Sequence, residues 1–465
     1  PLPVDMRFNL KQGIRLKLDY DKRVSTDLWF EGPSSKLALT RGEVVLGEGQ
    51  AVLRDKPGAS IIGKFKTLDW PAWEQVFKKL QLKPLKPSDA SGDSDSDRAK
   101  GFQSINLSFD KADVFKQNYQ DLTLYAQRMP DNVWSVVMKT SDVSADLKYE
   151  PTQNYLSGSI SAWRLNLPGA AEDKPLHLKP QQIPKLKLKI GQLQVGGVNA
   201  GRLFLKGAPA DDAAWHLDMG KLTADAYVLK ASGVWQDTPK PETRVDVELN
   251  INHVEKALTH WDISPAVEAS EGELQLHGAW DGAPHDFSVK GVTGQLKVMF
   301  KDGRIPNLSP ETEKKMALGK VLSILSLQTI PRRLKLDFSD LAKPGYSFDK
   351  FDGHFVLAHG IMETEDSEIN GPVARATMNG SLNLDKHLYD LSLHVMPHIT
   401  ASLPVVATIA GGPVAGIATW VASKLINQGM EKISGYTYDV SGPWDEPVVQ
   451  QVHIYKKVIV PSEQV

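Results

Sequence analysis

Three aspartates, Asp93, Asp95 and Asp97, have the alternate spacing with which an EF-hand loop begins to bind calcium. The pattern then fails. Arg98 stands where such a loop requires glycine, and Ser104 stands where it requires a bidentate glutamate. A solvated acidic loop accounts for these carboxylates better than a calcium site does.

Histidine is the other residue type that could bind a metal. His394 and His398 are four residues apart, but Pro397 between them prevents a regular helix from presenting both rings on one face. His253 and Glu255 have no second pair of ligands nearby. The chain contains no cysteine, which excludes thiolate metal sites, disulfides and cysteine nucleophiles. We therefore predict that the protein uses no metal and no cofactor.

The motifs of common enzyme classes are also missing. The sequence has no Gly-x-Ser-x-Gly elbow, and Gly319 and Lys320 lack the earlier glycine and the following hydroxyl residue of a Walker A loop. A pair of catalytic carboxylates comes together only in the folded protein, so this possibility stays open, although nothing in the sequence favours it. The 54 basic and 56 acidic residues give a net charge of -2, which argues against nucleic-acid binding. We predict a protein that is not an enzyme.

Period-two alternation of apolar and polar residues dominates the chain and is typical of strands with one apolar face. We predict a mainly β protein, in which an elongated, continuous, curved antiparallel sheet forms an apolar groove, with a few short helices and a C-terminal helical segment. The apolar members of the clearest alternating runs are Leu186, Leu188, Ile190, Val245, Val247, Leu249, Ile251, Leu336, Phe338, Leu391, Leu393 and Val395.

Turn signals separate these runs. Gly-Gly, Asp-Gly or Asn-Gly pairs at 196–197, 281–282, 302–303, 352–353, 370–371 and 379–380 predict hairpin turns. Short helices are expected at 71–81 and 309–325. Residues 83–100 are rich in Pro, Ser and Asp and predict a disordered loop. The expected segments are groove strands and a helix (1–82), the loop (83–100), further groove strands (101–308) and a distinct C-terminal region (309–465).

The one-sided strands need something to cover their apolar faces. A sandwich of two sheets would do so, but a chain of 465 residues should then divide into repeated domains joined by linkers, and one linker stretch is evident. The alternative is a single curved sheet whose concave apolar face is not filled by protein. Acyl chains fit such a trough, so the twelve alternating residues above are predicted to line a lipid groove.

The stretch 399–423 contains no charged residue and is long enough to span a bilayer, which takes about 20 residues. Pro404, Gly411, Gly412 and Pro413 interrupt it. Three interpretations stay open: a buried helical hairpin that caps the sheet, an amphipathic segment that touches a membrane, and a transmembrane helix. The membrane-contacting side of the second would be Val405, Val406, Ile409, Ile417, Trp420 and Leu425.

A series of short motifs in the last third of the chain, at about 291–447, resembles the C-terminal region of the AsmA-like family, YhdP branch. Each motif is weak alone, and their order is what is specific. They are VLSILSLQTIPRRLKLDFSDL (321–341), YSFD (346–349), NGP (370–372), SLP (402–404), AGGPVAG (410–416) and YTYDVSGPWDEP (436–447).

This resemblance implies a large envelope protein of Gram-negative bacteria, anchored in the inner membrane by a helix outside this fragment, with a long β-sheet groove in the periplasm. It implies bridge-like phospholipid transport between the inner and outer membranes, with this piece near the outer membrane and no catalytic residues. The expected partners are phospholipids, the outer membrane and other envelope proteins. Two alternatives stay open: an envelope scaffold with a protein-filled core, and a carbohydrate-active β protein suggested by eleven tryptophans.

Overall fold

The structure is a computed structural model, and the chain divides into two compact units. Unit 1 comprises Pro1–Leu176 and Gln182–Pro209, and unit 2 comprises His177–Gln181 and Ala210–Val465. The described residues are 4–9, 13–21, 23–33, 37–69, 101–114, 117–165, 179–210, 213–261, 267–306, 345–372, 374–397, 433–444 and 447–456.

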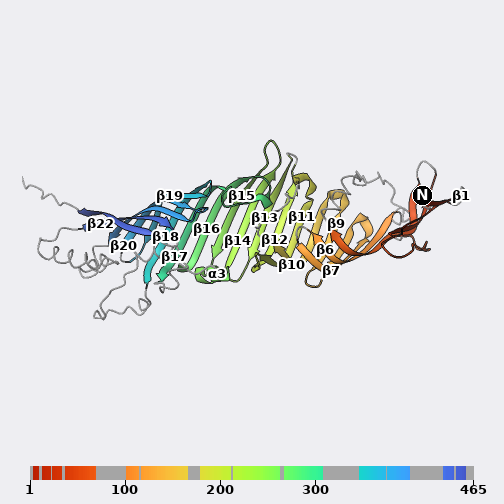
Figure 1. Cartoon of the computed structure of the whole chain (residues 1–465), viewed down its shortest axis with the longest axis horizontal. Helices are drawn as coiled ribbons and strands as arrows, with labels where there is room; N and C mark the ends of the chain where they lie inside the picture. The colour runs from red at the N-terminus through yellow and green to blue at the C-terminus, as the bar shows by residue number, and fades with distance from the viewer. Residues whose placement is uncertain are drawn as a thin grey trace, which may run out of the picture. The chain divides into compact units, whose positions relative to one another are not determined.

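In unit 1 each strand pairs with the strands before and after it in the chain (Figure 1). Short 3-10 turns at Pro130–Asn132 and Pro151–Gln153 connect some of them. The strands are β1 (Val4–Asn9), β2 (Gly13–Tyr20), β3 (Val24–Glu31), β4 (Ala38–Leu46), β5 (Gly58–Asp69), β6 (Phe102–Val114), β7 (Gln117–Arg128), β8 (Trp134–Lys139), β9 (Ser144–Glu150), β10 (Tyr155–Leu165), β11 (Lys185–Val195) and β12 (Val198–Pro209).

Three neighbouring pairs in unit 1 are parallel, although most of the sheet is antiparallel as expected. They are β4 with β5, β5 with β6, and β10 with β11. A parallel neighbour requires the chain to cross to the other end of the sheet before it pairs again, which a two-residue turn cannot do. The connections at 47–57, 70–101 and 166–184 make these crossings. Their sequences contain Gly, Pro and Asp, as turns of any kind do, and gave no sign of strand direction.

The connection at 47–57 crosses the polar side of β3 and β4 and buries polar groups there. The Val52 amide donates to the Glu43 carboxylate (3.2 Å), and the Ala51 amide donates to the Ser25 hydroxyl (3.0 Å). Arg15 in β2 donates two hydrogen bonds to Asp27 in β3, at 2.8 and 2.7 Å. Both carboxylates are buried, and their charges are matched by these donors, as buried charges must be.

Unit 2 is built in the same way, and all of its described pairs are antiparallel. One helix, α3 (Val254–His260), and a 3-10 turn at Pro284–Asp286 lie in its described part, and the residues of a second 3-10 turn, Pro180–Gln182, are divided between the two units. The strands are β13 (Ala214–Thr223), β14 (Tyr227–Gln236), β15 (Glu242–Ile251), β16 (Glu268–Asp281), β17 (Thr293–Pro306), β18 (Gly345–Ala358), β19 (Ile361–Asn370), β20 (Ala374–Asn383), β21 (Leu388–Pro397), β22 (Ile433–Pro443) and β23 (Val448–Lys456).

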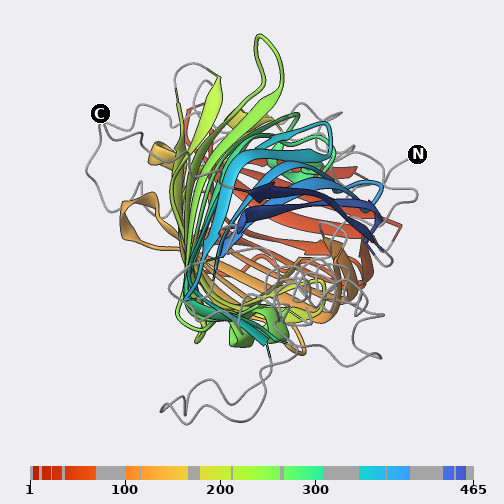
Figure 2. The ribbon, with the colours of Figure 1, turned by 90° about the vertical axis from the view of Figure 1, so that its left-hand side faces the viewer.

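The sheets are curved, and no pairing among the described residues closes either unit into a barrel. Figure 2 shows that the strands of unit 2, coloured green to blue, bend along their length. Register shifts mark local irregularities, for example between Asp352 and Val356 and between Thr364 and Ser367. The predicted fold class, mainly β with a curved sheet and few helices, is confirmed.

The structure confirms some of the predicted hairpin turns and contradicts others. Gly196 and Gly197, both at positive φ, form a two-residue turn between β11 and β12, and a turn after Asn370 joins β19 to β20. The pairs at 302–303, 352–353 and 379–380 lie inside strands, so those three predictions were wrong. The pairs at 352–353 and 379–380 lie beside the two register shifts, where an irregular strand needs a small residue.

Several predictions concern residues outside the described part of the chain. These are the helices at 71–81 and 309–325, the loop at 83–100, and the whole stretch 399–423. The four expected segments also stay predictions.

Candidate functional site

The register of unit 1 places one row of apolar side chains across its sheet. Directly paired residues on neighbouring strands point to the same face, so a chain of such pairs traces that face from strand to strand. From β2 to β12 the row is Leu18, Thr26, Val44, Ile61, Ile105, Ala126, Val136, Leu147, Gly158, Leu188 and Leu205. A single hydroxyl, that of Thr26, interrupts it.

The residues one position along each strand point the other way, and they are polar. The row has a charged, hydroxyl or amide side chain at every strand from β2 to β12. Its members are Lys17, Asp27, Glu43, Ser60, Ser104, Gln127, Ser135, Lys148, Ser157, Lys187 and Lys206. The sheet of unit 1 therefore has one apolar and one polar face.

Unit 2 shows the same division. Its polar side carries the paired row Lys221, Lys230, Glu248, Gln275, Lys297 and His354 from β13 to β18. Its apolar side carries a row without any charged residue from β14 to β22, which is Tyr227, Ile251, Gly272, Phe300, Phe351, Ile369, Ala376, Val395 and Tyr436.

The apolar face of unit 2 is covered to different degrees along the sheet. In β15, β16 and β17 its side chains are half-exposed, as at Leu249, Leu274 and Val298. In β21 and β22 they are buried, with Val395 at 3% and Val440 at 0% exposure. Among the described residues the strands of each unit pair only with their lateral neighbours, and no second sheet lies over the half-exposed region. Apolar surface is therefore left for another occupant at β15–β17.

Ten of the twelve residues predicted to line a groove lie on these apolar faces. Leu186, Leu188 and Ile190 lie in β11 of unit 1. The remaining seven lie in unit 2, in β15 and β21: Val245, Val247, Leu249, Ile251, Leu391, Leu393 and Val395. Leu336 and Phe338 lie outside the described residues, as do the six predicted membrane-contacting residues, Val405, Val406, Ile409, Ile417, Trp420 and Leu425.

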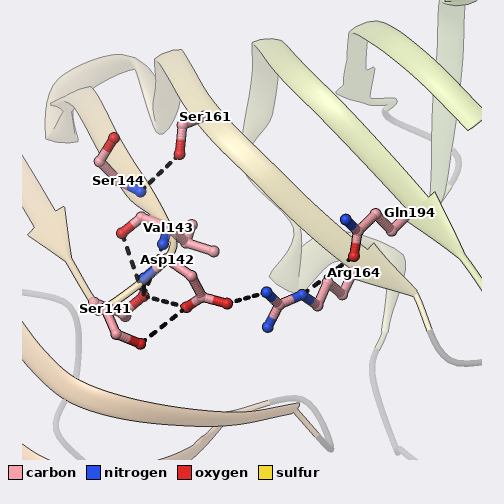
Figure 3. Close-up of polar contacts among 8 residues, drawn as sticks. Ser141, Asp142, Val143, Ser144, Ser161, Arg164 and Gln194 are labelled. Atoms are coloured by element: carbon pink, nitrogen blue, oxygen red, sulfur yellow. Dashed lines mark hydrogen bonds and ion pairs between the residues drawn. The ribbon is translucent and has the colours of Figure 1, made fainter. Parts of the chain in front are cut away.

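A polar cluster, here called the rim cluster, lies at the turn between β8 and β9 and near the ends of β10 and β11, and it consists of Thr140, Ser141, Asp142, Arg164 and Gln194. Figure 3 shows Arg164 between the Asp142 carboxylate and the Gln194 amide. Arg164 forms an ion pair with Asp142 and donates a hydrogen bond from Nε to Gln194 Oε1 (3.2 Å). The Thr140 and Ser141 hydroxyls donate to Asp142 Oδ1, at 3.1 and 3.3 Å.

The alternation of faces is disturbed beside the rim cluster. In β10 and β11, Ile160 pairs with Ile190 and Arg164 pairs with Gln194. Between these two pairs β11 shifts its register against β12, and Ile190 and Leu193, three residues apart, are both buried. A count of residues therefore does not carry the face of the two isoleucines over to Arg164 and Gln194.

The charges of the rim cluster affect its titration. Burial raises the pKa of the Asp142 carboxyl, but hydrogen bonds from Thr140, Arg164 and Ser141 and the Arg164 charge outweigh it, so the pKa lies below its usual value. Burial raises the pKa of the Tyr119 hydroxyl, the Arg164 charge lowers it, and Asp142 adds a smaller increase. Tyr119 packs against the buried cluster of Phe109, Ala112 and Leu122.

The model of the YhdP protein family matches residues 1–449 of the chain. The chain belongs to the YhdP family. Among curated proteins it is similar to the "Intermembrane phospholipid transporter YhdP" of Escherichia coli (strain K12), with 27% identity over 225 residues. That match covers 48% of this chain and 17% of the relative, so the chain corresponds to a small part of the relative's length. No solved structure gives a significant match.

The described part of this YhdP-family chain shows neither a metal site nor a membrane-spanning helix. No group of three or more His, Asp or Glu side chains there could hold a metal ion. None of the helices in that part of the chain is long and apolar enough to cross a membrane.

Sequence reasoning missed the rim cluster. Thr140, Ser141 and Asp142 form a turn signal that could have been noticed, since short hydroxyl and carboxylate side chains stabilise turns. Arg164 follows Leu156, Ile160 and Trp163 in a run whose period is disturbed near its end. No spacing rule connects Arg164 to a turn 22 residues earlier, so the ion pair follows only from the strand register.

We expect Asp142→Asn to lower the thermal stability of the chain slightly at neutral pH. The pair is half-exposed, so its contribution is below about 1 kcal/mol. The folded pKa of Asp142 lies below its unfolded value, so this contribution is present above the unfolded pKa and is lost as pH falls through the folded pKa. Melting curves of wild type and Asp142→Asn should differ at about pH 7 and converge at about pH 2. A difference between the two melting curves that persists at about pH 2 would show that the charge of Asp142 is not what stabilises the folded chain.

Proposed function

We propose that this chain is part of a bridge-like carrier that moves phospholipids across the periplasm between the inner and outer membranes. Acyl chains would lie on the apolar faces, and polar head groups would project from the open edge. The observation that carries the proposal is the succession of uncharged, mostly apolar residues on paired strands in each unit. Membership of the YhdP family and the printed activity of the Escherichia coli relative support the same substrate class.

The composition of the lining suits movement of lipid. Each buried CH2 group contributes about 0.8 kcal/mol, so a whole acyl chain is held by area alone. A lining of similar aliphatic residues offers similar binding energy at successive strands. In unit 1 the row changes chemically little from Leu18 to Leu205. A lipid that advances by one strand therefore exchanges one apolar contact for another.

The proposal also states where in the cell the protein acts and which membranes it contacts. The chain would act in the periplasm as part of an inner-membrane-anchored protein, without catalysis, and its C-terminal end would contact the outer membrane. The predicted groove residues in β11, β15 and β21 would contact acyl chains. The residues of 399–423, Trp420 among them, would contact the membrane or cap the sheet.

Site-specific photo-crosslinking in cells tests the proposal directly. A photoreactive residue is placed at Leu188, Leu249 or Leu393, and attached molecules are identified by mass spectrometry. Lys187 and Glu248 are the matched controls, because each is the immediate neighbour of a tested residue and points to the polar face. We expect phospholipid adducts at the three leucines and none at the two controls.

Protein adducts at the leucines, without lipid, would overturn the proposal in favour of a scaffold whose apolar face is covered by another protein. Equal lipid labelling at Leu249 and Glu248 would also contradict it, since lipid would then coat the surface without regard to face. The half-exposed Leu249 is the more sensitive of the three positions, because Leu188 and Leu393 are at most 7% exposed.

A further inference from the structure

We infer that the apolar face of unit 2 contains a discrete site for a phospholipid acyl chain, in which the chain lies across strands β14–β17 and not along them. This inference rests on the proposed function and deepens it, because it gives the lipid a location and a direction. The site is a band of half-exposed aliphatic side chains, here called the aliphatic band. Covered rows of the same face enclose it.

The aliphatic band consists of two neighbouring rows of directly paired residues, and β14–β17 pair there without a register shift. The first row is Leu229, Leu249, Leu274 and Val298. The second row, two residues along each strand, is Ala231, Val247, Leu276 and Leu296. All of these side chains are aliphatic and half-exposed. They offer no hydrogen bond to a polar head group, so they suit the hydrocarbon part of a lipid.

Helix α3 closes one side of the aliphatic band, at the ends of β15 and β16, which it connects (Figure 1). The next row of the apolar face contains Tyr227 and Gly272. A Cβ added at Gly272 would lie 3.0 Å from Val254 of α3, so the buried Val254 side chain lies over this row. The buried Tyr227 ring lies 6.2 Å from the His260 ring and 6.4 Å from the Trp261 ring at the end of α3. An acyl chain cannot occupy this row unless the helix moves.

A buried cluster closes the opposite side of the aliphatic band. Its members are Trp280, Val292 and Leu357. Gly278 belongs to the row beyond the band, and a Cβ added there would lie 3.5 Å from Val292, so Val292 covers that row. The Trp280 indole Nε1 donates a hydrogen bond to the Ala283 carbonyl (2.9 Å), which fixes the ring in place.

The dimensions of the aliphatic band fit an acyl chain in one direction. The two rows are about 7 Å apart along each strand, whereas the backbones of β14 and β17 are about 14 Å apart. An acyl chain spans about half of the hydrocarbon core of a bilayer, or about 15 Å. A straight chain of this length fits across the strands of the band. Along a strand it would collide with α3 or with the Trp280 cluster.

The curvature of the sheet and the ends of the band agree with this direction. The strands of unit 2 bend along their length (Figure 2), so a straight chain stays in contact with the sheet better across the strands than along them. At one end, Leu222 on β13 pairs with Leu229 and is buried. At the other end, Phe355 on β18 pairs with Leu296 and is buried. The band is therefore about one acyl chain long.

The test uses the purified chain and vesicles of phosphatidylglycerol whose acyl chains carry a photoreactive diazirine. One probe carries it near the glycerol and the other near the methyl end. After irradiation, mass spectrometry of peptides locates the adducts. We expect the adducts of both probes to stay within the aliphatic band and to extend over its strands, from Leu229 to Val298, whichever way the chain points. Adducts that extend along β15 instead, from Val245 to Ile251, would overturn the inference.

The same experiment separates this inference from the proposed function. Adducts in unit 1 with none in the aliphatic band would show that protein covers the band. That result would overturn the inference and leave the proposed function standing. A wild-type chain that takes up no lipid would contradict the proposed function itself.

Ala231→Phe tests the length of the aliphatic band without a photoreactive lipid. Ala231 is the smallest side chain of the band and lies on β14, so phenylalanine would fill that end and shorten the site. From an equimolar mixture of dipalmitoyl and dilauroyl phosphatidylglycerol, we expect this variant to lower the ratio of bound long to bound short lipid about threefold or more. The reason is that each CH2 group that loses its contact forfeits about 0.8 kcal/mol.

Ser232→Phe is the matched control for Ala231→Phe. Ser232 is the next residue and pairs with Asp246 on the polar face, so this variant should leave the lipid ratio as in wild type. Circular dichroism establishes that both variants fold. A wild-type ratio in a folded Ala231→Phe protein that still binds lipid would overturn the inference.

Discussion

Leu249→Asp is expected to lower the lipid that co-purifies with the chain by about tenfold or more, which corresponds to about 1.4 kcal/mol. Leu249 lies in the half-exposed part of the apolar face, between Leu229 on β14 and Leu274 on β16. A carboxylate at this point would have to lose its water to accommodate an acyl chain, which costs several kcal/mol. The bound lipid is measured by mass spectrometry after extraction from the purified protein.

Glu248→Lys is the matched control for Leu249→Asp. Glu248 is the preceding residue, points to the polar face and lies 3.8 Å from Lys230 in an ion pair. Reversing this charge disturbs the surface of the same strand as much as the test variant does, but it leaves the apolar face unchanged. Circular dichroism establishes that both variants fold. Wild-type amounts of lipid in a folded Leu249→Asp protein would contradict a groove at β15.

Gly294→Ala is expected to destabilise unit 2 by roughly 3 kcal/mol, through backbone strain and a steric clash. Gly294 has a φ of 152°, a conformation that residues with a side chain rarely adopt. An added Cβ would overlap the carbonyl oxygen of His277 on the neighbouring strand and would come within 2.9 Å of the Gly278 Cα. Hydrogen exchange of the amides in β16 and β17 measures the loss of stability locally.

Gly278→Ala provides the comparison, because Gly278 is the direct partner of Gly294 across the two strands. It does not have a positive φ, and a Cβ there would lie 3.5 Å from its nearest neighbours, an ordinary contact. This variant should change the exchange rates in β16 and β17 far less than Gly294→Ala does. Equal acceleration by both variants would show that the backbone conformation of Gly294 is not what matters.

The sequence predicts which side chains share a face of a strand better than it predicts the direction in which neighbouring strands run. Alternation places Val245, Val247, Leu249 and Ile251 on one side of a strand, because side chains alternate strictly with a period of two. The direction of β5 relative to β4 and β6 was not predictable in this way, because the same alternation fits a parallel and an antiparallel neighbour. Direction depends on where a long connection ends, and no local residue determines that.

Glycine in an Asp-Gly or Asn-Gly pair has two possible roles, and the pair alone does not distinguish them. Gly197 completes a turn, whereas Gly380 lies within β20 beside a register shift. The rim cluster was unpredictable for a similar reason, since Arg164 and Asp142 come together only once β8, β9 and β10 are in register. Short-range patterns thus predicted the apolar face of each strand, and long-range pairing determines the rim cluster.

The pairing of each strand with its neighbours in the chain has a consequence for assembly and for length. Contacts between adjacent segments have low contact order, so each hairpin can join the sheet as soon as it is complete, without waiting for distant parts of the chain. Stability then resembles that of a repeat protein, in which each element interacts with the elements beside it. Insertion or loss of a two-stranded hairpin would lengthen or shorten such a sheet while every remaining side chain kept its face. The length of each sheet can therefore change in evolution by whole hairpins, and one of its faces stays apolar throughout.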